Sequence, residues 1–171
     1  MALRNGYHGT AGNAYNLTSI GTWTSPLAKG NAIERLAWPN FYRNAHSSVE
    51  SLIKDAEEQM DSNTNGKVAG LWLEPVMGAG GIIPLQKSYV QALHRMVKKM
   101  GGLYISDEVQ TGFCRIGKES WGFKWQEVKP DIVVMAKAIG NGIPLSAVAT
   151  RREIADALTH DYFPTFAGGP L

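Results

Sequence analysis

The sequence predicts an α/β fold in which a mostly parallel sheet is flanked by helices. Three short apolar segments, 68–73, 103–106 and 131–136, are typical of buried strands. Two longer segments, 47–60 and 87–100, carry apolar residues at helical spacing and alternate with those strands. This alternation favours parallel strands joined by helical crossovers, because a parallel connection must cross back over the sheet.

The chain begins with a segment rich in Gly, Asn, Thr and Ser, in which Pro26 and Pro39 interrupt any regular element. We expect residues 1–46 to be irregular and to run over the surface. The first helix follows, with Ser47 or Ser48 as its expected N-cap.

The remaining elements are separated by glycine-rich turns. The segment 77–81 reads as a flexible turn before the second helix, and Gly101 with Gly102 ends that helix. Near the end of the chain we expect a further strand at 147–150 and a short helix at 152–159.

A polar residue follows each of the three predicted core strands: Glu74, Asp107 and Lys137. In open parallel sheets, ligands bind outside the carboxyl ends of the strands. We therefore expect two carboxylates and an amine along one edge of the sheet. Lys137 needs such an explanation, because lysine is rarely buried without a partner and here it ends a core strand.

The composition limits the classes of function. The 171 residues are 44% apolar, which can supply the core of one domain, and 17 basic against 15 acidic residues give a net charge of +2. We therefore expect no nucleic acid and no membrane as the main partner. One cysteine, Cys114, excludes an internal disulfide framework, and His46, His94 and His160 show no metal-ligand spacing.

The expected location is intracellular and soluble. The first residues contain no apolar segment of the kind found in secretory signals, and no apolar run approaches the length of a membrane span. The single cysteine fits a reducing compartment.

Asp107 and Lys137 each have an ordinary interpretation. Asp107 could simply face solvent past its strand, and Lys137 alone could be a solvated charge. Asp107 could also be the metal-binding acid of a nucleotide hydrolase, but that class needs a loop of the form GxxxxGK[ST], which the sequence lacks. Together on adjacent strands they fit a pyridoxal phosphate site, which needs a lysine amine in a partly desolvated place and an acid against the pyridine nitrogen.

Four segments resemble one family. ISDEVQTGFCRIG at 105–117 and DIVVMAKAIGNG at 131–142 are similar to the signature of the class III (omega) pyridoxal-phosphate aminotransferases. LRNGYHGT at 3–10 and PTFAGGP at 164–170 also resemble that family. The pattern is most similar to the alanine–glyoxylate aminotransferase 2 branch. It implies the large domain of a fold-type I aminotransferase.

The resemblance assigns roles to five residues around the ring of pyridoxal 5′-phosphate. Lys137 resembles the lysine that forms the Schiff base and moves the proton, and Asp107 resembles the partner of the pyridine nitrogen. Val109 would pack on one face of the ring and Tyr7 would stack on the other. Gln110 would approach the ring hydroxyl oxygen.

Two further residues follow from the same resemblance. His8 would lie beside Tyr7, and Thr165 resembles the residue that reaches the cofactor phosphate of a neighbouring subunit. That role implies a homodimer or higher oligomer with shared active sites. Taken singly, Tyr7 and Val109 could be core residues, His8 a loop histidine, and Thr165 a cap or turn residue.

The implied reaction transfers an amino group from an alanine-like donor to a 2-oxo acid such as glyoxylate or pyruvate. Two alternatives stay open: other pyridoxal phosphate chemistry, such as a phospho-amine lyase or an aminomutase, and an inactive truncated subunit.

The sequence departs from the family pattern at two positions. Ala79 stands where several family members carry a second glutamate that pairs with a distant arginine, and Gly169 replaces an asparagine.

Family members are usually much longer than 171 residues. We therefore expect 1–171 to be an internal fragment of the large pyridoxal-phosphate-binding domain. The N-terminal arm and the C-terminal small domain, with its carboxylate-binding arginine, would lie outside it. Related branches include mitochondrial enzymes, and any targeting segment would lie upstream of Met1.

Overall fold

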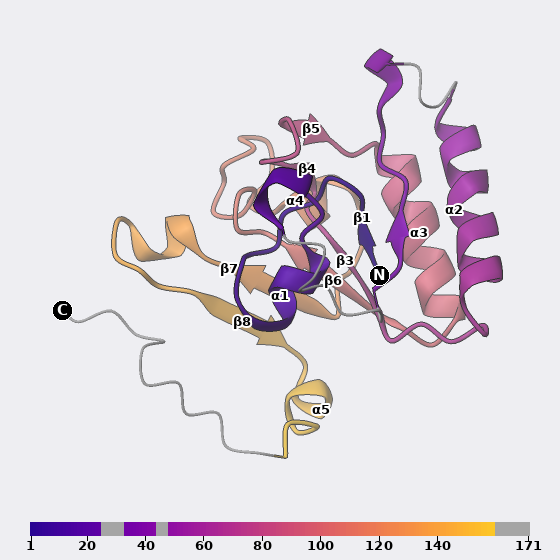
Figure 1. Cartoon of the computed structure of the whole chain (residues 1–171). Coiled ribbons are helices and arrows are strands. Elements are labelled where there is room, and N and C mark those ends of the chain that lie inside the picture. The colour runs from indigo at the N-terminus through magenta and orange to yellow at the C-terminus, as the bar shows by residue number, and fades with distance from the viewer. Residues whose placement is uncertain (25–32, 44–47, 160–171) are drawn as a thin grey trace.

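The computed structural model of the chain describes residues 1–24, 33–43 and 48–159. Within them, one six-stranded sheet has the order β2-β1-β3-β6-β7-β8 (Figure 1). The strands are β1 (Ala2–Leu3), β2 (Arg35–Leu36), β3 (Gly70–Leu73), β6 (Leu103–Asp107), β7 (Ile132–Met135) and β8 (Ala147–Thr150).

The sheet is mostly parallel, which confirms the predicted α/β fold. β2, β1, β3, β6 and β7 pair in parallel, and β8 alone pairs antiparallel with β7. The central register aligns Leu73 with Ser106 and Asp107 with Val134. The carboxyl ends of β3, β6 and β7 therefore meet at one edge.

The prediction that residues 1–46 are irregular was wrong in part. β1 lies inside the sheet between β2 and β3, and Ala2 and Leu3 are buried. β2 forms the edge beside it, with Leu36 in the core. Strands of two residues are too short to show an alternating pattern, so only their tertiary pairing reveals them.

Two helices, α2 (Val49–Asn63) and α3 (Lys87–Lys99), lie side by side on one side of the sheet (Figure 1). α3 contacts β3 and β6, and the apolar residues of both helices join the core of the sheet. Ser48 begins α2 as predicted: its hydroxyl accepts from Ser51 N, and the Ser51 hydroxyl accepts from Ser48 N.

Several boundaries differ from the predicted ones. α2 continues to Asn63, beyond Met60, and the predicted turn at 77–81 lies within a two-stranded hairpin. The hairpin consists of β4 (Val76–Met77) and β5 (Ile83–Pro84). The remaining short helices are α1 (Gly12–Leu17), η1 (Gly21–Trp23), η3 (Phe41–Arg43), α4 (Gly122–Trp125), η4 (Lys137–Gly140) and α5 (Arg152–Ala155).

In the part of the chain that the structure describes, no helix is both long enough and apolar enough to cross a membrane.

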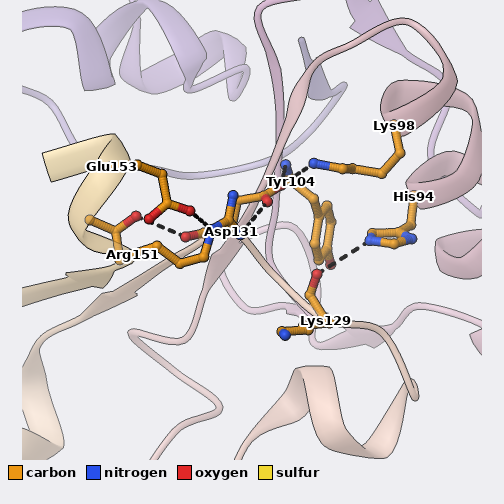
Figure 2. A network of polar contacts seen from close by, with 8 residues as sticks. His94, Lys98, Tyr104, Lys129, Asp131, Arg151 and Glu153 are labelled. Carbon is orange, nitrogen blue, oxygen red and sulfur yellow. Dashed lines mark hydrogen bonds and ion pairs between the residues drawn. The ribbon is translucent and has the colours of Figure 1, made fainter. Parts of the chain in front are cut away.

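A buried aspartate joins the elements around β7 (Figure 2). Asp131 Oδ2 accepts from Lys98 Nζ and from Tyr104 N, both at 2.8 Å, and Oδ1 accepts from Arg151 Nη1 at 2.8 Å. Burial opposes the charge on Asp131, but these donors outweigh it and lower the pKa of Asp131 from 3.8 to about 2. Asp131 thus connects α3, β6 and the start of α5.

Asp131→Asn is expected to lower the free energy of unfolding by about 1–3 kcal/mol at pH 7, because Lys98 and Arg151 lose their shared carboxylate. Since the pKa is depressed in the folded state, wild-type stability from this group is present above pH 3.8 and falls as pH drops towards 2. Urea unfolding followed by circular dichroism at several pH values measures both effects. Glu153→Gln, at an exposed partner of Arg151, is the control, and equal losses in both variants would contradict the assignment.

Candidate functional site

A cavity of about 200 Å³ lies at the carboxyl ends of β3, β6 and β7. It brings together six of the seven site residues predicted from the sequence, together with Glu74 and Ala79. The seventh, Thr165, lies outside the described residues. The ten lining residues are Tyr7, His8, Gly9, Glu74, Ala79, Asp107, Val109, Gln110, Val134 and Lys137.

Asp107 is the last residue of β6 and is buried. Its Oδ2 accepts from His8 Nδ1 at 2.8 Å and from Trp72 Nε1 at 3.2 Å. Its Oδ1 accepts from Val109 N at 3.3 Å, a long contact within the turn that follows the strand. The interpretation of Asp107 as a solvent-facing acid is therefore wrong.

His8 is held in place at both its backbone and its ring. The His8 side chain is only 1% exposed, and its Nδ1 faces Asp107. The Thr18 hydroxyl accepts from His8 N at 2.9 Å and donates to Gly9 O at 2.7 Å. These bonds hold the loop that carries Tyr7, and the role of His8 towards a cofactor stays a prediction.

Glu74 joins two walls of the cavity. Its Oε1 accepts from Tyr7 N at 2.8 Å, and its Oε2 accepts from Gly78 N at 2.9 Å. Burial raises the pKa of Glu74, and the nearby charge of Asp107 adds to the rise, while the two backbone donors and His8 oppose it. The carboxylate thus positions backbone on both sides of the site.

Lys137 begins η4, separated from the end of β7 by Ala136, and lines the cavity. Its backbone is left-handed, with a φ of 49°, which costs a non-glycine residue roughly 1–3 kcal/mol and is most often seen at functional sites. The expectation that Lys137 is partly desolvated was wrong for the described chain. Its side chain is exposed, because it stands past the end of the strand, where the sheet edge is open.

Tyr7 and Gln110 also line the cavity, and their surroundings fix them. The Tyr7 ring packs edge-on against Trp23, with 5.3 Å between the ring centroids. Gln110 lies against Gly78, where an added Cβ would come within 3.1 Å of Gln110 Cγ. An alanine at 78 would therefore require the Gln110 side chain to shift by a few tenths of an ångström.

Two residues that hold the site in place were not predicted from the sequence. Trp72 looks like an ordinary apolar residue of a core strand, and only the neighbouring strand shows that its indole reaches Asp107. Glu108 is completely buried beside Asp107. The sequence shows the two as an acidic pair but does not indicate that their roles differ.

Glu108 organises the loop that follows β6. Its Oε1 accepts from the Ser106 hydroxyl and from Phe123 N, both at 2.9 Å. Its Oε2 accepts from the Thr111 hydroxyl and from Gly122 N, the latter at 2.8 Å. One carboxylate thus connects the end of β6 to the start of α4, and the segment between them includes Gln110.

A second cavity of about 630 Å³ shares Tyr7, Ala79, Gln110 and Lys137 with the first. Much of its remaining lining is apolar, with Arg115 as a cation. The other lining residues are Trp23, Val76, Gly78, Ile82, Thr111, Arg115 and Ile116.

The chemistry of the first cavity suits a flat ring that carries a protonated nitrogen and a carbonyl group. Asp107 offers a negative acceptor, Tyr7 and Val109 offer an aromatic and an apolar surface, and Lys137 offers an amine. Among the described residues, no group of three or more His, Cys, Asp and Glu side chains is placed to hold a metal ion.

Comparisons with known proteins agree with this chemistry. The model of the family described as "Aminotransferase class-III" matches residues 1–171. The alanine–glyoxylate aminotransferase 2 homolog 2, mitochondrial, of Arabidopsis thaliana is 44% identical over 173 residues, which cover 100% of this chain and 36% of the relative. The ethanolamine-phosphate phospho-lyase homolog 1 of Caenorhabditis elegans is 42% identical over 127 residues, covering 72% of this chain and 26% of the relative.

Among solved structures, a thermostable (S)-enantioselective omega-transaminase from Thermomicrobium roseum superposes with a TM-score of 0.83 at 31% identity. The match covers 98% of this chain and 39% of that structure. The chain therefore spans well under half the length of the proteins that it matches.

Glu108→Gln is expected to lower the free energy of unfolding by roughly 1–3 kcal/mol. The Ser106 and Thr111 hydroxyls can rotate to accept from the new amide, but one backbone N–H, of Gly122 or Phe123, then faces an NH₂ group and loses its acceptor. Chemical denaturation measures the loss, and Glu119→Gln in the same loop is the matched control. A loss no larger than that of the control would mean that Glu108 does not hold the loop.

Proposed function

Because the chain belongs to the class-III aminotransferase family, we propose that it carries the site of a transaminase acting on small amino acids. The donor would be alanine-like and the acceptor a 2-oxo acid such as glyoxylate or pyruvate, as in the reaction named for the Arabidopsis relative. The observation that carries the proposal is that Asp107, at the end of β6, and Lys137, just past the adjacent strand β7, line one cavity.

The fold agrees with this proposal. The mostly parallel sheet with its flanking helices is that of the fold-type I transaminases, to which the solved relatives belong. We propose that residues 1–171 belong to the large cofactor-binding domain of such an enzyme.

The proposed cofactor is pyridoxal 5′-phosphate, which when bound supplies a ring that withdraws electrons from the reacting carbon of the substrate. Asp107 would accept a hydrogen bond from the ring nitrogen, and Tyr7 and Val109 would pack against the two faces of the ring. Gln110 would approach the ring oxygen. Lys137 would hold the cofactor covalently through Nζ.

Lys137 would have a second task once a substrate amine has replaced it. Its Nζ would take the proton from the substrate carbon and deliver it to the cofactor. The exposed position of Lys137 at the border of the two cavities supports this task, because the side chain can turn from one cavity to the other. The larger, mostly apolar cavity would hold the substrate beside Lys137.

The assembly and location belong to the same proposal. Thr165 would reach the phosphate held by a neighbouring subunit, so the working enzyme would be a homodimer or a higher oligomer with shared sites. The name of the Arabidopsis relative places that protein in mitochondria, and we extend this location to the present chain as a proposal.

A phospho-amine lyase is the second candidate function. Its support is the Caenorhabditis elegans relative, whose name describes a lyase acting on ethanolamine phosphate. Both reactions would use the same lysine and aspartate, so the site alone does not separate them. The substrate must therefore be tested directly.

Borohydride reduction of the purified chain with pyridoxal phosphate is expected to attach the label to Lys137, as mapped by peptide mass. Lys137→Ala should lose that label because no other described lysine lines the cavity with Asp107. Lys99→Ala, at an exposed lysine at the end of α3, should keep it. Label scattered over surface lysines in the wild type would mean that this chain has no working site and is an inactive subunit.

L-Alanine, added to the chain loaded with pyridoxal phosphate, is expected to yield pyruvate, and glyoxylate added afterwards should yield glycine. Coupled assays for pyruvate and amino acid analysis for glycine measure the two half-reactions. In a parallel assay, ethanolamine phosphate is the substrate and the release of inorganic phosphate is measured. Release of phosphate without formation of pyruvate would contradict the transaminase proposal and support the lyase.

A further inference from the structure

We propose that Trp72 is a positioning residue for Asp107, and that it turns one carboxylate oxygen towards the cavity. This inference rests on the proposed function, since the oxygen so directed would receive the ring nitrogen of the cofactor. Trp72 is outside both the motifs that identify the family and the residues that line the 200 Å³ cavity.

The hydrogen bonds of Asp107 divide unequally between its two oxygens. Oδ2 accepts from His8 Nδ1 at 2.8 Å and from Trp72 Nε1 at 3.2 Å. A carboxylate oxygen offers about two acceptor sites, so Oδ2 is fully used. Oδ1 has only the 3.3 Å contact from Val109 N and keeps capacity for a further donor.

The sheet fixes the place of the indole. Trp72 pairs with Ile105 of β6, two residues before Asp107, and with Ala2 of β1 on the other side. Leu71 and Leu73, its neighbours in β3, are buried in the core, which prevents the strand from turning over. The indole of Trp72 therefore lies on the face of β3 opposite to Leu71 and Leu73, where its N–H reaches Asp107.

Trp72 also packs against His8, the other side-chain donor to Asp107. Its ring lies 5.8 Å from the His8 ring, centroid to centroid, at a tilt of 56°. An indole nitrogen can only donate, so its bond to Asp107 has one direction. Two donors on Oδ2 resist rotation of the carboxylate more than His8 and the long contact from Val109 N would without Trp72.

Trp72→Phe removes the N–H and keeps an aromatic ring in the strand. We expect pyridoxal phosphate to bind about fivefold to tenfold more weakly to this variant, as followed by absorbance in a titration. Trp125→Phe, in α4 and away from the cavity, is the matched control and should bind as the wild type does. Thermal unfolding of both variants shows whether they remain folded.

A second measurement needs no cofactor. In a ¹H–¹⁵N spectrum, each of the five tryptophan indoles should give its own signal, and Trp72→Phe would identify the one from Trp72. That proton should move upfield in Asp107→Ala, because its charged acceptor is gone, and less so in Asp107→Asn. The other four indole signals should stay in place.

The outcomes separate the two proposals. An unmoved Trp72 signal in both Asp107 variants, or equal affinities of Trp72→Phe and Trp125→Phe, would overturn the positioning role while the proposed function stands. If the wild type binds no pyridoxal phosphate, the proposed function fails, and the role of Trp72 towards that cofactor fails with it. Weaker binding in Trp72→Phe alone, together with the upfield shift, supports the inference.

Discussion

The parallel pairing of β3, β6 and β7 is the constraint on which the site depends. Asp107 lies opposite Val134, and Lys137 follows three residues later, past the end of β7. A slip of one residue between β6 and β7 would carry Asp107 to the other face of the sheet and bury a charge among the helices. The apolar core beneath the strands therefore does more than stabilise the fold, because it holds the register that brings the acid and the amine together.

Two aspartates on this sheet show how position decides function. Asp131 precedes β7 and is bound by the cations of Lys98 and Arg151, so its charge is used within the fold (Figure 2). Asp107 ends β6, and among the described residues its side-chain donors are His8 and Trp72, with no lysine or arginine bound to it. Under the proposed function its negative charge would face the cofactor, so the two ends of one sheet would carry a structural and a functional carboxylate.

Much of the fold and the residues around the cavity could be predicted from the sequence, because strand-end residues and short motifs are local features. The contact between His8 and Asp107 spans 99 positions along the chain and has no local signal. β1 was missed for a related reason, since a strand of two residues has no period. The exposure of Lys137 was missed because the sequence does not show how far the sheet edge is covered.

The contact between Trp72 and Asp107 places a fluorophore against the site. Trp23 stands on another side, in edge contact with Tyr7. Indole emission overlaps the near-ultraviolet absorption of a conjugated pyridine ring, so a ring bound between these residues would accept their excitation energy. Two indoles beside the site would therefore report, by a loss of their emission, whether such a ring is bound.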